Sequence, residues 1–84
     1  MRPGDAATLD SRGFTYLKTH EWDKAIADYD TALRAHPAQA SSLFGRGIAK
    51  LRKGDAAGGN ADLSAARRIQ ADIATEMAAI GIAP

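Results

Sequence analysis

The sequence contains no cysteine and only short apolar runs, and these absences exclude several classes of protein. Without cysteine, neither a disulfide framework nor a thiolate metal site can form. The longest apolar stretches are a few residues, far below the ~20 residues that a membrane-spanning helix needs. The formal net charge of +1 creates no strong field that would attract nucleic acid or an anionic membrane.

The size and composition of the chain favour one small helical domain. With 84 residues it forms at most one domain and can bury only a thin core. Alanine dominates, whereas β-branched residues are few and scattered, so the composition favours helix over strand. Residues 1–5 lack the apolar core of a secretory signal, and the cytoplasm is the default expectation.

An internal repeat organises the chain. With an offset of 34 residues, Arg12 and Gly13 align with Arg46 and Gly47. Four further pairs match in order: Leu9 with Leu43, Leu17 with Leu51, Asp28 with Asp62, and Ala32 with Ala66. A second shift places Met77 on Leu43 and Gly81 on Gly47. The chain therefore contains two similar units and the beginning of a third.

Each unit is predicted to form two helices joined by a tight turn. Apolar residues spaced i, i+3, i+4, i+7 and i+8 mark one face of the second helix: Ala25, Ile26, Tyr29, Ala32 and Leu33. Pro37 ends that helix, and Asp5 or Thr8 is the expected cap of the first one. We expect an all-α fold of about five antiparallel helices near residues 5–19, 22–35, 40–53, 56–69 and 73–80.

A helix–turn–helix unit of this length resembles the tetratricopeptide repeat family. Six residues of the first unit match the family's preferences: Gly13, Tyr16, Ala25, Tyr29, Ala32 and Pro37. The resemblance implies a single α-solenoid domain, with one repeat at residues 6–39, a second at 40–73 and a partial third or capping helix at 73–81. It covers almost the whole chain. We expect the apolar face of the last helix, formed by Ile73, Met77 and Ile80, to pack on the second unit.

The second unit departs from the first at several positions. Lys50 stands where Tyr16 stood, Gly59 replaces Ala25, and Ala71 replaces Pro37. Because glycine inside a helix costs about 0.5–1 kcal/mol relative to alanine, Gly58 and Gly59 predict a soft start to the fourth helix. Weaker hydrogen-exchange protection at residues 56–62 than at 24–31 is the expected sign.

The resemblance also implies a concave groove lined by the first helix of each unit. The groove positions are Asp10, Phe14, Leu17, Lys18, Phe44, Ile48, Leu51 and Arg52. Such a groove would take an apolar or amphipathic segment of another protein. The alternative is that some of these residues simply pack between helices. The family's Lys–Asn clamp for a partner's terminal carboxylate is absent, because Asp10 with Phe14 and Phe44 with Ile48 take those positions.

Chemistry-bearing clusters are sparse. Neither His20 nor His36 has a second ligand at helical metal-site spacing, and no serine lies in a nucleophile motif. We therefore expect no cofactor, no metal and no enzymatic activity. Arg46, Lys50 and Lys53 share one side of a helix, which indicates either a patch for an acidic partner or long side chains covering the core edge. The second reading is favoured.

Two classes of function remain for this sequence. The leading hypothesis is a protein–protein interaction scaffold that binds a peptide or helix in the concave groove. The alternative is a structural module that self-associates, or the C-terminal part of a longer repeat array, because stable arrays usually need about three repeats. The expected partner is therefore another protein or a second copy, and neither nucleic acid nor a membrane is expected.

Overall fold

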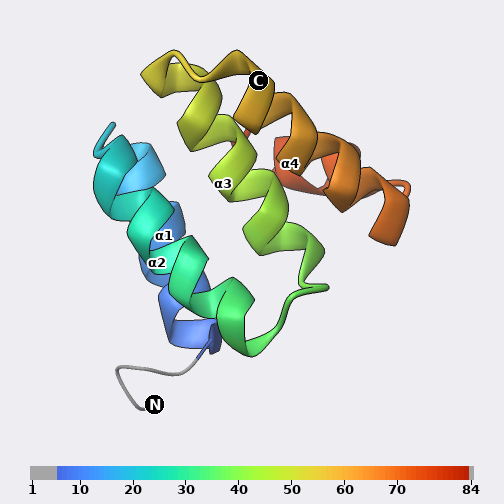
Figure 1. The fold of residues 1–84 in the computed structure, drawn as a ribbon, viewed down its shortest axis with the longest axis horizontal. Helices are drawn as coiled ribbons and strands as arrows, with labels where there is room; N and C mark the ends of the chain where they lie inside the picture. The colour runs from blue at the N-terminus through green and yellow to red at the C-terminus, as the bar shows by residue number, and fades with distance from the viewer. Residues whose placement is uncertain (1–5, 84) are drawn as a thin grey trace.

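Helices alone build the fold. The computed structural model describes residues 6–83, with only the backbone of Ala6. Five helices and no strand occur in this range, so the predicted all-α class is confirmed (Figure 1). They are α1 (Ala6–Lys18), α2 (Trp22–Ala35), α3 (Ala40–Lys53), α4 (Ala56–Ile69) and α5 (Ile73–Ala79). Among the described residues, no helix is both long and apolar enough to span a membrane.

The helices begin and end close to the predicted residues. Thr8 lies inside α1 and is therefore not its cap, while Asp5 falls outside the described residues. Asp55 caps α4, where its carboxylate accepts a hydrogen bond of 2.9 Å from the N–H of Gly58. Asp72 precedes α5 without a capping side-chain bond.

Three helices end in a residue with positive φ that reverses the chain. These residues are His20 (φ 60°) after α1, Gly54 (103°) after α3 and Gly81 (91°) after α5. In each case the following N–H donates to a carbonyl in the last helical turn: Glu21 to Tyr16 (2.8 Å), Asp55 to Lys50 (2.8 Å) and Ile82 to Met77 (2.9 Å). This Schellman arrangement directs the chain back along the helix that it has just left.

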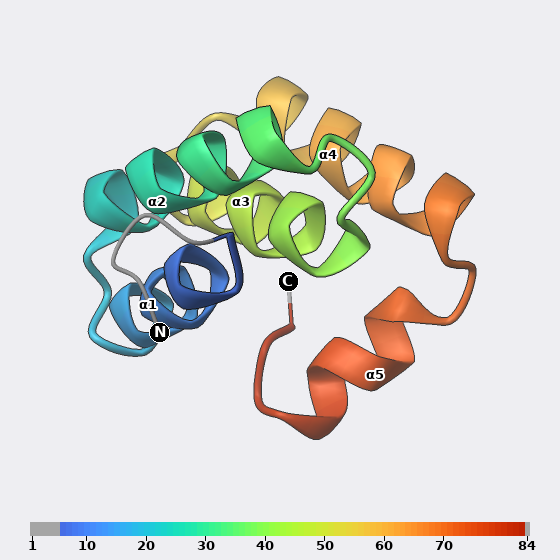
Figure 2. The ribbon, with the colours of Figure 1, turned by 90° about the horizontal axis from the view of Figure 1, so that it is seen from below.

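The first four helices form two antiparallel pairs. α1 packs against α2 and α3 packs against α4, while contact between α2 and α3 joins the pairs. In Figure 2, α2 and α4 lie above α1 and α3, and α5 lies on the other side, below α3. As predicted, α5 packs on the second pair, against both α3 and α4, and Ile73 and Met77 are buried. Ile80, expected on the same face, is instead 52% exposed, because it follows the end of α5.

Large side chains fill the spaces that glycines leave open. Tyr29 and Phe44 are at most 1% exposed and form the centre of one continuous core. A Cβ atom added at Gly13 would lie 2.8 Å from Tyr29 Cζ, and one at Gly45 would meet the same ring. The Tyr29 ring therefore occupies space beside both α1 and α3, and it ties the two helix pairs together.

Candidate functional site

Two hollows open on the side of the molecule formed by α1, α3 and the C-terminal segment. The large hollow has a volume of about 400 Å³ and lies between Leu17, Lys18, Ile48 and Arg52 on the helices and residues 81–83 on the tail. The small hollow has a volume of about 210 Å³ and is lined by Asp10, Phe14 and Tyr29 on one side and by Met77, Ile80 and Ile82 on the other. Ile82 borders both hollows.

Six of the eight predicted groove residues line these hollows: Asp10, Phe14, Leu17, Lys18, Ile48 and Arg52. The other two line neither of them. Phe44 is fully buried in the core. Leu51 turns toward α4, because its Cγ lies 2.7 Å from where a Cβ at Gly59 would be. For these two residues, packing between helices describes the position better than a binding role does.

The structure adds residues that the sequence analysis did not place in the groove. Ile82 is only 4% exposed and belongs to the same buried cluster as Leu17 and Ile48. His20 and Trp22, from the turn between α1 and α2, line the large hollow as well. A sequence signal for Ile82 was available, since an apolar residue directly after a helix-ending glycine commonly packs back on the last turn of that helix.

The two cations of the large hollow make no ion pair with any residue in the described part of the chain. Lys18 Nζ lies over the ring of Phe14, 5.2 Å from its centroid, and Arg52 is exposed. Of the residues that line this hollow, none is acidic. The large hollow therefore combines apolar walls with a positive rim.

Asp10 is held by hydroxyl groups rather than by a cation. Ser42 Oγ donates a hydrogen bond of 2.7 Å to Asp10 Oδ1, and Ser41 Oγ lies 3.4 Å from both carboxylate oxygens. These contacts join α1 to α3 at the wall of the small hollow. Asp10 thus links the two helices. Within residues 6–83, no histidine is bonded to the fully buried Ser42.

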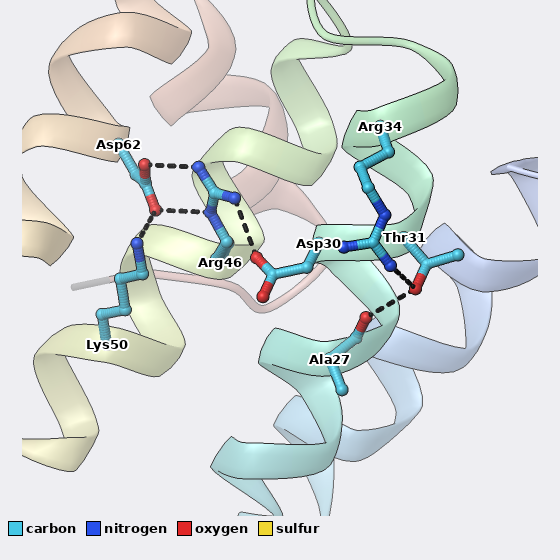
Figure 3. Close-up of polar contacts among 7 residues, drawn as sticks. All are labelled: Ala27, Asp30, Thr31, Arg34, Arg46, Lys50 and Asp62. Carbon is cyan, nitrogen blue, oxygen red and sulfur yellow. Dashed lines mark hydrogen bonds and ion pairs between the residues drawn. The ribbon is translucent and has the colours of Figure 1, made fainter.

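A cluster of charged residues joins α2, α3 and α4 away from the hollows (Figure 3). Arg46 donates 2.8 Å and 2.9 Å hydrogen bonds to both oxygens of Asp62 and a 2.8 Å bond to Asp30. Lys50 Nζ lies 3.1 Å from Asp62, and Lys53 pairs with Asp23. The three cations that share one side of α3 therefore have acidic partners within the chain.

The electrostatic environment shifts the pKa values of two buried groups in opposite ways. Burial by itself raises the pKa of Asp62, but hydrogen bonds from Arg46 and Lys50 outweigh it, so the pKa lies below its ordinary value. Burial raises the pKa of Tyr29, and the charges of Asp10 and Asp28 raise it further. Both groups are thus kept in their neutral-pH forms, Asp62 ionised and Tyr29 protonated.

Each histidine lies in the segment that follows a helix, His20 after α1 and His36 after α2. His20 stacks on Trp22 with the ring centroids 5.0 Å apart, and His36 is exposed after the end of α2. Within residues 6–83 there is no group of three or more histidine, aspartate or glutamate residues that could hold a metal ion.

Comparisons with models of protein families, with curated proteins and with solved structures found no match.

Proposed function

We propose that this chain is a tetratricopeptide-type repeat module that binds an apolar segment of another protein between α1 and α3. The observation that carries the proposal is the burial of Ile82. Its side chain is 4% exposed among residues of α1 and α3, in the position that a bound side chain would take. The surface between these helices therefore accommodates an apolar side chain presented by a separate segment.

The repeat character is supported by contacts that recur at the same offset as the sequence. Arg12 binds Asp28 through bonds of 2.7 Å and 2.9 Å, and Arg46 binds Asp62 through the same atoms at 2.8 Å and 2.9 Å. His20 and Gly54, also 34 residues apart, both adopt positive φ in the same kind of turn. Two units that repeat both an ion pair and a turn favour a stacked helix-hairpin architecture.

Selection from a displayed library of random peptides tests the binding function. We expect selected peptides to be rich in apolar residues and to weaken about tenfold on Phe14→Ala, because this half-buried ring lines the small hollow. The matched control is Ile69→Ala, which removes an exposed apolar side chain from α4. Equal binding to the Phe14→Ala variant, or backbone NMR shifts confined to α2 and α4, would overturn the proposal.

A specific observation also supports the self-association alternative. Ile69 and Ile80 are large apolar side chains that are 48% and 52% exposed. Ile69 ends α4 and Ile80 follows α5, and exposed apolar residues of the last helices in an array are natural contacts for a second copy. Sedimentation over a range of concentrations tests this function: a dimer that Ile69→Asp or Ile80→Asp disperses supports it, and a monomer throughout contradicts it.

A further inference from the structure

The groove between α1 and α3 already has an occupant, the segment that follows α5. After α5, Gly81 adopts a φ of 91° and its N–H donates to the carbonyl of Ala78 (3.0 Å). The N–H of Ile82 donates to the carbonyl of Met77 (2.9 Å), so the chain reverses. In Figure 2 the red segment after α5 turns back toward α1 and α3. The Schellman turn thus delivers Ile82 to the groove.

The hold on this segment comes mainly from one side chain. In the described chain, the backbone hydrogen bonds of residues 80–82 all go to α5, and none goes to α1 or α3. Ile82 is 4% exposed, whereas Ile80 is 52% exposed. α5 itself has seven residues, too few for a helix to be stable on its own. A partner that supplies an equivalent apolar side chain would therefore replace the contact that holds the segment.

From this arrangement we infer that residues 80–83 block the groove in cis, and that the partner is an apolar segment with an acidic flank that displaces them. The inference rests on the proposed function and names the chemistry of its ligand. The apolar side chain takes the place of Ile82 beside Leu17 and Ile48. The acidic flank faces Lys18 and Arg52, because the large hollow has these cations at its rim and no acidic residue in its lining.

Charge complementarity favours this partner over a second copy of the chain. Residues 80–83 read Ile-Gly-Ile-Ala, so no side chain of this segment brings a carboxylate to Lys18 and Arg52. A partner that adds a carboxylate gains a contact that the cis segment does not make. That difference allows a foreign segment to compete with one that is covalently attached and so present at a high effective concentration.

Displacement can be followed in the native chain because its single tryptophan lines the large hollow beside Ile82 and Ala83. The probe is a synthetic peptide with the sequence of residues 72–84 in which Ala83 is replaced by glutamate. Titration is followed by Trp22 emission and by calorimetry. Two further probe peptides serve as controls, one with lysine at position 83 and one in which Ile82→Asp removes the apolar side chain.

The central variant is Ile82→Asp in the chain, which removes the cis side chain and frees the groove. We expect it to bind the glutamate probe about tenfold or more tightly than the unaltered chain, because the competent fraction of molecules rises. The matched control, Ile69→Asp, changes an exposed isoleucine of α4 that lines neither hollow, and it should bind as the unaltered chain does. On the freed groove, the lysine probe should bind several-fold more weakly than the glutamate probe.

A second variant covers the case in which Ile82→Asp does not fold. Gly81→Ala keeps Ile82 but disfavours the positive φ of the turn, so it should bind the glutamate probe with an affinity between those of the unaltered chain and a freed groove. Far-UV circular dichroism confirms that each variant is helical before it is titrated.

The possible outcomes separate this inference from the proposed function. Equal probe affinity for the unaltered chain, Gly81→Ala and any folded Ile82→Asp chain would show that residues 80–83 do not block the groove, and the binding function would stand. Changed Trp22 emission in the variants, with no binding of either the glutamate or the lysine probe, would overturn both. A dimer of the unaltered chain that Ile82→Asp abolishes would assign the groove to a second copy and overturn the proposed partner.

Discussion

The two helix pairs, α1 with α2 and α3 with α4, reach the same hairpin by different means. Both carry a bidentate arginine–aspartate pair at equivalent positions, Arg12 with Asp28 and Arg46 with Asp62. In the first pair the arginine side chain is 50% exposed, and in the second it is 21% exposed. The ion pair of the second hairpin is therefore the more deeply embedded, and its loss is expected to cost more.

The helix crossing also differs between the pairs. In the first pair Ala25 takes the position that Gly59 occupies in the second. In the second pair, Gly47 of α3 and Gly59 of α4 face each other. A Cβ atom added to either glycine would lie within 2.9 Å of the other's carbonyl oxygen. Close backbone approach thus replaces the side-chain packing of the first pair. The comparison teaches that a glycine which lowers helix propensity can be required by the packing between helices.

The largest expected effect comes from filling this crossing. Gly59→Val places a β-branched side chain against the Gly47 carbonyl and Leu51, so the helices must separate. We expect a loss of about 3 kcal/mol in the free energy of unfolding, measured by chemical denaturation. The matched control is Asn60→Val at the exposed neighbouring position, with a change of about 0.5 kcal/mol or less. A loss for Gly59→Val no larger than for the control would contradict the close crossing.

Removal of the embedded arginine is the next largest effect. Arg46→Met keeps the length of the side chain but takes the guanidinium from Asp62 and Asp30, so that Lys50 alone pairs with Asp62. We expect the free energy of unfolding to fall by about 2 kcal/mol, which lowers the thermal unfolding midpoint of a chain of this size by roughly 8–16 °C. Arg12→Met, the equivalent change in the first pair, should cost less because its side chain is half exposed. The reverse order would refute the comparison.

The pH dependence of Asp62 gives a smaller effect with a defined sign. The native pKa of Asp62 lies below the unfolded value of about 3.9, so its contribution to stability is complete above that pH. It disappears as the pH falls through the native pKa. The stability difference between the unaltered chain and Asp62→Asn should therefore be constant near neutral pH and shrink below about pH 4. Asp23→Asn, at a carboxylate that is 76% exposed, is the control, and an equal pH trend there would contradict the assignment.

Much of the fold follows from the sequence because local signals agree with one another. The 34-residue offset, the apolar spacing in α2 and the helix-ending Pro37 all predict the observed helices. The soft start predicted for α4 stays a prediction, but the structure gives Gly59 a reason that helix propensity could not supply. Its hydrogen is opposite a backbone carbonyl of another helix, and a contact of that kind has no local signature.

The groove was harder to predict, because its lining depends on the direction in which side chains point. The family resemblance implies Leu51 as a groove residue, yet it packs toward Gly59, since a glycine there leaves room for it. Ile82 was missed because its signal is a single apolar residue after the helix-ending Gly81 and not a periodic pattern. Six residues that line the hollows could be named from the sequence, whereas the position of Ile82 against α1 and α3 depends on the direction that the turn at Gly81 gives to the chain.

The smallest effect tests the turns that close the two hairpins. His20 and Gly54 adopt positive φ at equivalent positions, and only glycine does so without steric cost. Gly54→Ala should lower the free energy of unfolding by about 1 kcal/mol, although nothing lies within 4 Å of the added Cβ, because the cost is backbone strain. His20→Gly should raise it by about 0.5 kcal/mol, since relief of the same strain is partly offset by the lost stacking on Trp22 and by the greater freedom of the unfolded chain. Thermal unfolding of both variants measures these two changes in stability. Shifts of the unfolding midpoint with the same sign would show that the two turns are not equivalent.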